Sequence, residues 1–75
     1  MVWVKIDKIE KSLYNNSLLV FFIFQEKKRY SVVSDKVLKY LKIKKVSKGD
    51  KIFVMKSFSD DDKPIYLIKK YETDK

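Results

Sequence analysis

The sequence predicts a small, mainly β domain with one short helix, and three observations lead to that prediction. Apolar and polar residues alternate near both ends of the chain, which is the period of a half-buried strand. The longest apolar run, Leu18 to Phe24, has seven residues, which suits a strand and falls far short of the ~20 that span a bilayer. Helical spacing occurs only after Ser34. With 75 residues, 45% of them hydrophobic, residues 1–75 are expected to form a single domain around one core.

The first predicted strand begins at the N-terminus. Val2, Val4 and Ile6 alternate with residues expected to face outward. Ile9 falls out of phase with this series. We therefore expect a bulge or sharp bend near residues 7–8 that returns the Ile9 side chain to the core.

The next two strands are expected to form a hairpin. Residues 14–17 (Tyr-Asn-Asn-Ser) indicate a turn, because Asn tolerates left-handed geometry and both Asn and Ser bond their own backbone. Residues 18–24 follow as a strand that is apolar on both faces. Residues 25–28 are expected to close the hairpin, and residues 29–33 to form the third strand, with Tyr30 and alternate residues on one face.

A short amphipathic helix is expected after the third strand. Ser34 is a suitable N-cap, and Asp35 places a carboxylate in the first turn, where it interacts favourably with the helix dipole. The helix is expected to end within residues 41–45. Its apolar face consists of Val37, Leu38 and Leu41.

Two more strands complete the predicted order. Residues 47–50 form a turn that holds the only glycine, and a strand follows at residues 51–58. A loop at residues 59–64 leads to the last strand, residues 65–71. Residues 72–75 are expected to be a frayed tail.

The resulting order is strand, strand, strand, helix, strand, strand over residues 2–71. Within it, Val46–Val54 (V-S-K-G-D-K-I-F-V) places a Lys-Gly-Asp turn directly before the fourth strand. Both features resemble the OB-fold, a small five-stranded Greek-key barrel. A Gly-Asp turn before a strand also occurs in SH3-like barrels, so the expected class is a five-stranded OB-like or SH3-like small barrel. The OB resemblance implies oligonucleotide binding on the face of the second and third strands, with flanking loops closing over it.

The composition argues against an enzyme. There are no cysteines and no histidines, which removes disulfides, thiol chemistry, Cys/His zinc sites and the commonest general base at neutral pH. The acidic cluster Asp60–Asp62 is expected to be a solvated hairpin tip rather than a metal site, because consecutive loop residues rarely converge on one ion. We expect no catalytic residues, no metal and no cofactor.

The charge is strongly positive and unevenly distributed. The net charge is +8, from 18 basic and 10 acidic residues, which favours a polyanionic partner. Residues 34–51 hold seven lysines against Asp35 and Asp50. Concentrated charge can neutralise several phosphates and release their counterions. A second basic cluster occupies residues 27–29. The alternative is a solvated, lysine-rich surface without a partner.

We therefore expect a non-catalytic nucleic-acid-binding protein that lacks sequence preference and favours single strands, through Lys/Arg–phosphate contacts and aromatic stacking. Arg29 is the expected directional phosphate contact, because a guanidinium binds phosphate bidentately. Trp3 is out of phase with the apolar residues of its strand and is expected on the outer face. The candidate binding residues are Trp3, Lys5, Phe21, Lys27, Lys28, Arg29, Tyr30, Lys36, Lys39, Lys42, Lys44, Lys45 and Lys48.

The main alternative is a protein-interaction module or assembly subunit, of viral or plasmid origin for example. An exposed apolar face would then bind a protein or join two copies as a homodimer, and its residues would be Trp3, Phe21, Phe53 and Tyr66. The loop Asp60–Asp62 would repel phosphates, so either this loop points away, or the binding site lies elsewhere, or the partner is not nucleic acid. No membrane partner is expected, because charged residues interrupt the N-terminus, and the expected location is intracellular and cytoplasmic.

Overall fold

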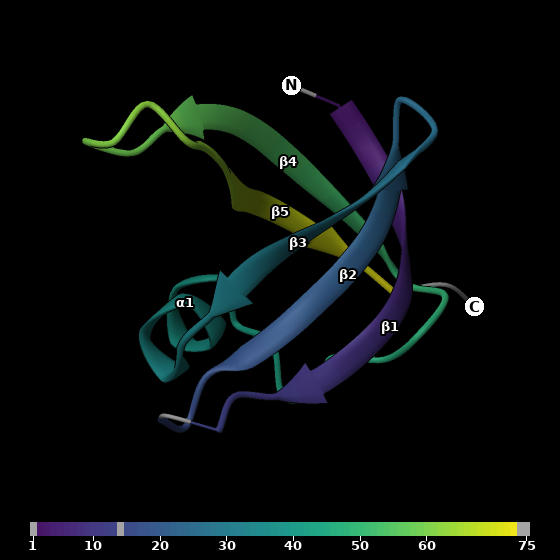
Figure 1. Ribbon diagram of the computed structural model, residues 1–75. Helices are drawn as coiled ribbons and strands as arrows, with labels where there is room; N and C mark the ends of the chain where they lie inside the picture. Colours follow the sequence, from purple (N-terminus) through teal and green to yellow (C-terminus); the bar gives the residue numbers. More distant parts are fainter. Residues whose placement is uncertain (1, 14, 74–75) are drawn as a thin grey trace.

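The computed structural model describes residues 2–13 and 15–73 and confirms the mainly β class and the order of elements (Figure 1). Five antiparallel strands form a half-barrel, and one short helix lies between the third and fourth strands. The elements are β1 (Val2–Lys11), β2 (Leu18–Phe24), β3 (Lys27–Val33), α1 (Asp35–Tyr40), β4 (Lys51–Phe58) and β5 (Pro64–Glu72).

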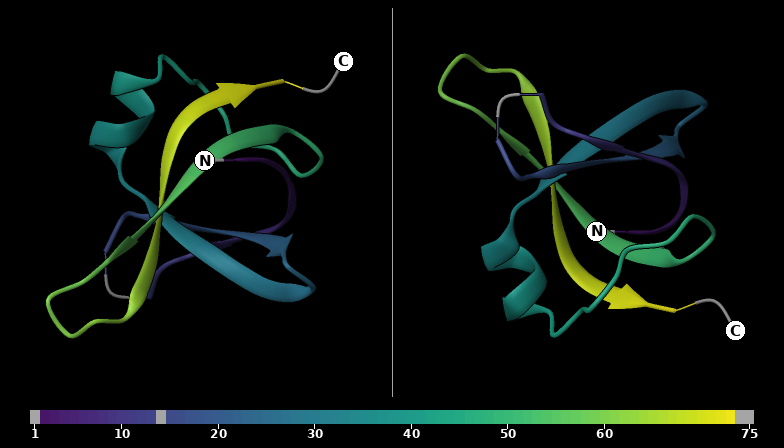
Figure 2. Two further views of the ribbon diagram at one scale, coloured as in Figure 1. Left: turned by 90° about the horizontal axis from the view of Figure 1, so that it is seen from above. Right: turned by 90° about the horizontal axis from the view of Figure 1, so that it is seen from below.

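The sheet has the strand order β3-β2-β1-β4-β5, so β1 is the central strand and β3 and β5 are the two edges. The β2–β3 hairpin and the β4–β5 hairpin run across one another when the molecule is viewed from above or below (Figure 2). This curl brings the two edges close together. Ser31 Oγ on β3 donates a hydrogen bond to the backbone carbonyl of Tyr66 on β5, at 2.6 Å. No backbone–backbone hydrogen bond joins β3 to β5, whose residues are all described. The barrel therefore stays partly open along this seam.

A bulge in β1 allows one strand to serve both halves of the sheet. Residues Val2–Lys5 pair with β4, whereas Lys8–Lys11 pair with β2, and the register shifts between Ile6 and Lys8. Ile9 lies opposite Val20 and packs against the core, which confirms the predicted bulge. Because a bulge increases local twist and bends the strand, it allows β1 to turn from one half of the sheet to the other.

The core lies between the two halves of the curled sheet. Phe22 is fully buried, and its ring meets the Tyr66 ring edge-on, with centroids 5.4 Å apart. The expectation that Tyr66 faces outward is wrong: it is 6% exposed, while Ile65 and Leu67 on either side are each 39% exposed. The sequence alone does not show which of these residues faces inward, because Ile, Leu and Tyr are all apolar enough to be buried. The buried apolar residues are Ile6, Val20, Phe22, Val33, Ile52, Val54 and Tyr66.

The helix α1 matches the predicted capping. The Ser34 side chain accepts a hydrogen bond from the backbone N–H of Val37 at 3.4 Å, and Asp35 lies in the first turn. Leu41 is the C-cap, and Lys42 follows with a left-handed φ of 56°, so α1 ends at Tyr40, one residue before the predicted range of 41–45. Val37 and Leu38 pack against the core.

The β2–β3 turn is tighter than the sequence predicts. Gln25 and Glu26 alone form the turn, with φ of 53° and 63°, so that Phe24 pairs directly with Lys27. Left-handed φ at both turn residues defines a type I′ turn. The sequence Asn-Gly favours such a turn, whereas Gln-Glu gives no indication of it. The expected four-residue turn at 25–28 is therefore wrong, and β3 begins two residues earlier than predicted.

The remaining turns and the C-terminus mostly agree with expectation. Ser17 N–H donates to Asn15 Oδ1 at 2.8 Å, the side-chain-to-backbone bond that the Asn-Ser turn predicts, while Tyr14 lies outside the described residues. Strand β5 extends through Glu72, which pairs with Lys51, and so enters the segment expected to be a tail. Residues 74–75 of that segment lie outside the described residues.

Candidate functional site

The most distinctive surface feature is a pair of aromatic rings, one half-buried and one exposed, flanked by lysines on the outer face of β1, β2 and β3. Phe21 on β2 lies opposite Tyr30 on β3 in the strand register, with ring centroids 5.9 Å apart. The ammonium groups of Lys8 and Lys28 lie 6.0 and 5.9 Å from the Phe21 ring centroid. Tyr30 is 55% exposed. We call these four residues (Lys8, Phe21, Lys28 and Tyr30) the aromatic–lysine cluster.

Strand register explains why the aromatic–lysine cluster forms. Lys8, Phe21 and Tyr30 are cross-strand neighbours in one row across β1, β2 and β3. Side chains directly opposite one another on the same face have Cβ atoms about 4.5–5.5 Å apart, which brings rings and long side chains into contact. Sequence reasoning missed Lys8, because its place in the row depends on the one-residue shift made by the bulge.

Apolar residues adjoin the aromatic–lysine cluster on the same face. Val32 is 53% exposed on β3 and lies opposite Leu19 on β2, while Ile23 is 52% exposed and lies opposite Lys28. Phe21, Tyr30 and Val32 also line a hollow of about 470 Å³ together with the β1–β2 loop. The outer face of the β2–β3 hairpin therefore combines exposed apolar surface with positive charge.

A second hollow connects this face to the turn before β4. It has a volume of about 540 Å³ and is lined by Lys5, Asp7, Ile23, Lys48 and adjacent backbone. Ile23 is the register partner of Lys28, so this hollow adjoins the aromatic–lysine cluster. The structure thus brings Lys5, Lys28 and Lys48, three of the predicted residues, to one continuous part of the surface.

Trp3 is exposed, as predicted, but belongs to a different aromatic row. It is 42% exposed and lies opposite Phe53 on β4, with ring centroids 5.2 Å apart. The ammonium of Lys70 on β5 lies 5.8 Å from the Phe53 ring centroid. This row crosses β1, β4 and β5, on the other half of the sheet from Phe21. The structure does not bring Trp3 together with the aromatic–lysine cluster.

Arg29 points the opposite way from its neighbours Lys28 and Tyr30. It is the register partner of the buried Phe22, which places it on the inner face of β3. Its guanidinium carbon lies 5.9 Å from the Tyr66 ring centroid. Arg29 is therefore separated from the outer face on which the OB resemblance implied phosphate contacts.

The other predicted lysines are exposed and lie apart from the aromatic rings. Lys27 lies at the tip of the β2–β3 hairpin, beside the turn. Lys36 and Lys39 lie on α1, beyond the end of β3 (Figure 1). The exposed residues that follow the helix are Lys42, Lys44 and Lys45.

The acidic loop lies at the tip of the β4–β5 hairpin. The Ser59–Lys63 tip is closed by hydrogen bonds from Ser59 N–H to the Lys63 carbonyl and from Asp62 N–H to the Ser59 carbonyl, both 2.9 Å. In both figures the β4–β5 tip and the tip of the β2–β3 hairpin are on opposite sides of the molecule. The turn before β4 also lies on the side away from the acidic loop (Figures 1 and 2).

The Lys-Gly-Asp turn has a structural role that its sequence did not reveal. Asp50 is 4% exposed and accepts a hydrogen bond from the Tyr71 hydroxyl. That hydroxyl in turn accepts a bond from Ser47 N–H at 3.1 Å. Burial of the ring, followed by its bond to the Asp50 carboxylate, raises the pKa of Tyr71 to about 12. Gly49 adopts φ of 94° and donates to the Ile6 carbonyl at 3.0 Å, which joins the turn to the bulge of β1.

The described residues 2–13 and 15–73 hold no group of three acidic, His or Cys side chains that could bind a metal ion. Over the same residues, no helix has the length and apolar character needed to cross a membrane. Comparison with protein-family models, curated proteins and solved structures gives no match to this chain. The side chains on the half-barrel are therefore the basis for assigning a function.

Proposed function

We propose that this protein is a non-catalytic, single-stranded nucleic-acid-binding domain that uses the outer face of β1, β2 and β3. The observation that carries the proposal is the position of Phe21, whose ring adjoins exposed Tyr30 and lies near the ammonium groups of both Lys8 and Lys28. The same few residues then provide both aromatic surface, on which bases can stack, and cations, which can contact phosphates. Single-strand binding requires both.

Stacking supplies the part of the affinity that favours single strands. A base stacked on an exposed ring contributes about 1–3 kcal/mol, whatever its identity. Bases in a duplex are already stacked on each other, so this contribution is available only to unpaired strands. Because the rings of Phe21 and Tyr30 offer little hydrogen-bond discrimination among bases, binding without sequence preference follows.

Lysines supply the salt-dependent part of the affinity. Lys5 and Lys48 line the hollow that adjoins the cluster, and Lys28 belongs to the cluster. All three lysines are exposed, and each can contact a phosphate. Lys8 pairs with Glu10 at 2.5 Å, and both side chains are about half exposed. An exposed ion pair of this kind contributes only about 0–1 kcal/mol, so a phosphate can compete for the Lys8 ammonium.

We further propose that the half-barrel is OB-like rather than SH3-like. Three observations support this: the helix lies between the third and fourth strands, β1 pairs with both β2 and β4, and β3 approaches β5 to leave a partly open barrel. An OB-fold is a five-stranded, partly open barrel whose second and third strands provide the oligonucleotide-binding face. The aromatic–lysine cluster lies on that face.

A second candidate function is protein binding through the same face. It is favoured by the exposed apolar residues Ile23, Tyr30 and Val32, which are each more than half exposed and adjoin one another on β2 and β3. Contiguous exposed apolar surface marks interaction sites as well. The two functions differ in salt dependence, because an apolar interface lacks the counterion release of phosphate binding.

The test is a titration of end-labelled single-stranded DNA and RNA, followed by fluorescence anisotropy at about 50 mM and about 200 mM salt. A label on the oligonucleotide is preferable to Trp3 emission, because Trp3 lies on the other half of the sheet. The expected result is binding that weakens steeply with salt and that Phe21→Ala reduces by about tenfold or more. Phe53→Ala, which removes a ring from the Trp3 row, is the matched control and should bind normally.

Absence of binding to single strands at about 50 mM salt would overturn the proposal, because the electrostatic contribution is large there. Equal losses in Phe21→Ala and Phe53→Ala would overturn the assignment of the site. Thermal unfolding of both variants checks that they remain folded.

A further inference from the structure

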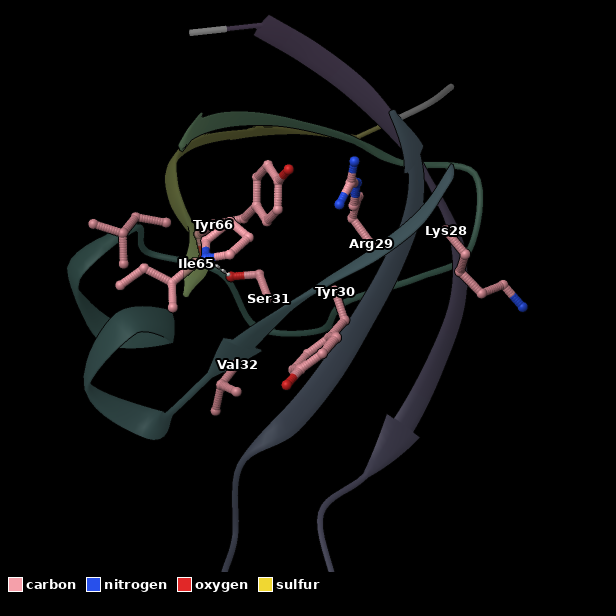
Figure 3. Close-up of a pocket in the computed structure, with 9 residues that line it drawn as sticks. Lys28, Arg29, Tyr30, Ser31, Val32, Ile65 and Tyr66 are labelled. Atoms are coloured by element: carbon pink, nitrogen blue, oxygen red, sulfur yellow. Dashed lines mark hydrogen bonds between the residues drawn. The ribbon is translucent and has the colours of Figure 1, made fainter. Parts of the chain in front are cut away.

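The open seam between β3 and β5 contains a pocket that adjoins the outer face of the hairpin and shares Lys28 and Tyr30 with the aromatic–lysine cluster. It has a volume of about 370 Å³, at the lower end of the ~300–1,000 Å³ typical of small-molecule sites. Residues Lys28–Val32 line one side and Pro64–Leu67 the other. Figure 3 shows the side chains of Arg29 and Tyr66 extending the same way from opposite sides of the seam, with Ser31 bonded across it.

Two buried polar atoms, on residues that line this pocket, have no hydrogen-bond partner within residues 2–13 and 15–73. The Tyr66 side chain is only 6% exposed, and its hydroxyl is buried without a partner. The Nε of Arg29 is likewise enclosed and unpartnered. Buried polar groups are nearly always bonded, and leaving one unbonded costs about 1–3 kcal/mol, more for a charged group. Two such atoms at one pocket indicate that a ligand supplies the missing partner.

Arg29 is distinctive among the basic residues. It is the only arginine among 18 basic residues of the chain. Every lysine within the described residues is exposed, whereas Arg29 is partly buried against the Tyr66 ring. A guanidinium is weakly hydrated, stacks on aromatic rings and binds phosphate or carboxylate oxygens bidentately, none of which an ammonium does as well. The chain thus places its one arginine where a directional anion contact can form.

The lining of the pocket defines the ligand class. The unpartnered Nε–H of Arg29 and the hydroxyl of Tyr66 both act as donors, and the lining residues include no carboxylate. An oxyanion satisfies both. The remaining surface includes the apolar side chains of Val32, Pro64, Ile65 and Leu67, which suit an uncharged ring or sugar attached to the anion.

We propose that the β3–β5 seam binds a phosphate monoester carried on a small ring-containing body, as in a mononucleotide, with Arg29 and Tyr66 as the donors to phosphate oxygens. The same group occurs at the end of a 5′-phosphorylated strand, so the ligand is either a free mononucleotide or a strand terminus. The two donors, Arg29 and Tyr66, are not members of the aromatic–lysine cluster, so monoester binding can be tested apart from strand binding even though the pocket shares Lys28 and Tyr30 with the cluster.

The test uses the full-length, ¹⁵N-labelled protein and the Nε–Hε resonance of Arg29, which needs no assignment because the chain has one arginine. It is titrated separately with adenosine 5′-monophosphate, inorganic phosphate and adenosine. The expected result is a saturable shift with the monophosphate and none with adenosine. The absence of a saturable shift at millimolar monophosphate, or an equal shift with adenosine, would overturn the proposal.

Oligonucleotides with and without a 5′-phosphate distinguish the two sources. A shift only with the phosphorylated strand identifies a strand terminus, and no shift with either strand identifies the free mononucleotide. An equal shift with both strands contradicts the monoester assignment, since an internal phosphodiester would then suffice.

Tyr66→Phe separates a binding role from a structural one. It retains the ring packed on Phe22 and removes only the unpartnered hydroxyl. We expect monophosphate affinity to fall about tenfold while the Tm of the ligand-free protein is unchanged or higher, because an unbonded buried polar group is lost. A lower Tm with unchanged affinity would mean that the hydroxyl is structural, and would contradict the proposal. Tyr40→Phe, at an 81% exposed tyrosine on α1, is the matched control.

Arg29→Lys retains the positive charge but removes Nε and the planar guanidinium group that can bind an oxyanion bidentately. We expect it to weaken monophosphate binding by about tenfold or more, measured by calorimetry. Unchanged affinity in this variant would show that charge alone is sufficient and would overturn the directional role of Arg29. Its binding to oligonucleotide lacking a 5′-phosphate should remain normal, which separates this site from the outer face.

Discussion

The Tyr71 hydroxyl donates a hydrogen bond to Oδ2 of Asp50, which joins the last strand to the turn before β4. The same hydroxyl accepts a bond from Ser47 N–H at 3.1 Å, so one phenol is bonded to both ends of the Ser47–Asp50 turn. Gly49 and Asp50 are in turn bonded to Ile6 at the bulge of β1. The network holds together the place where the two halves of the sheet diverge.

Removing the phenol is therefore expected to destabilise the fold. Tyr71→Phe leaves the 4% exposed Asp50 carboxylate without this donor, and the expected loss is about 1–3 kcal/mol in the free energy of unfolding. Urea denaturation measures it, with Tyr40→Phe as the control on an exposed tyrosine. A loss in Tyr71→Phe no larger than in the control would mean that the bond contributes little.

The same phenol predicts an alkaline loss of stability. The pKa of Tyr71 is raised from 10.0 to about 12 in the folded protein, so between these values the folded state retains a proton that the unfolded state has released. Under that condition stability falls as pH rises. The stabilising contribution of the Tyr71 phenol to the free energy of unfolding is complete below pH 10 and is lost as pH rises through about 12. The measurement is the difference in the free energy of unfolding between wild type and Tyr71→Phe, which should shrink across this window.

The β2–β3 turn offers a stabilising substitution. Gln25 and Glu26 both have left-handed φ, which costs a residue with a Cβ atom roughly 1–2 kcal/mol relative to the right-handed region. The double substitution Gln25→Asn and Glu26→Gly introduces the Asn-Gly pair preferred in type I′ turns, and should raise the Tm and slow unfolding. Glu26→Gly with Gln25 retained should give part of the gain. A lower Tm in both variants would contradict the strain argument.

Much of the fold follows from local patterns in the sequence. Strand boundaries at Leu18 and Phe24, the Ser34 cap and the displaced Ile9 were all predictable, because apolar periodicity, capping chemistry and bulges act over a few residues. The tight turn at 25–26 was not, since tertiary pairing imposes left-handed φ on residues that do not prefer it.

The candidate site was less predictable, because it depends on which strands become neighbours. Phe21 and Tyr30 were among the predicted binding residues, although alternation left open whether Phe21 or Phe22 and Phe24 would face outward. Lys8 joins Phe21 and Tyr30 only through the strand register of β1 and β2. Arg29 was expected beside them, and alternation within β3 instead places it on the inner face. The meeting of Arg29 with Tyr66 depends on the closure of β3 toward β5, which no local pattern encodes.

The position of the acidic loop leads to a prediction about salt dependence. Double substitution of Lys8 and Lys28 by Gln should reduce the slope of log affinity against log salt by about 1.4, since each phosphate contact on a single strand contributes ~0.7. Neutralising Asp60–Asp62 with Asn should leave that slope unchanged. The Asp60–Asp62 carboxylates make no phosphate contact, so they release no counterion when a strand binds. A comparable change of slope in both variants would contradict the proposed site.

The bulge in β1 also determines the order in which the chain can assemble during synthesis. Lys8–Lys11 meet their partner as soon as β2 leaves the ribosome, and β3 then completes a three-stranded meander. Val2–Lys5 have no partner until residues 51–54 have been made, so the N-terminus must wait for most of the chain. A nascent chain that stops before β4 would present the inner apolar face of the meander and an unpaired strand edge to the cell. Rapid completion of translation, or a chaperone that covers this face, would then determine how much of the protein reaches its folded form.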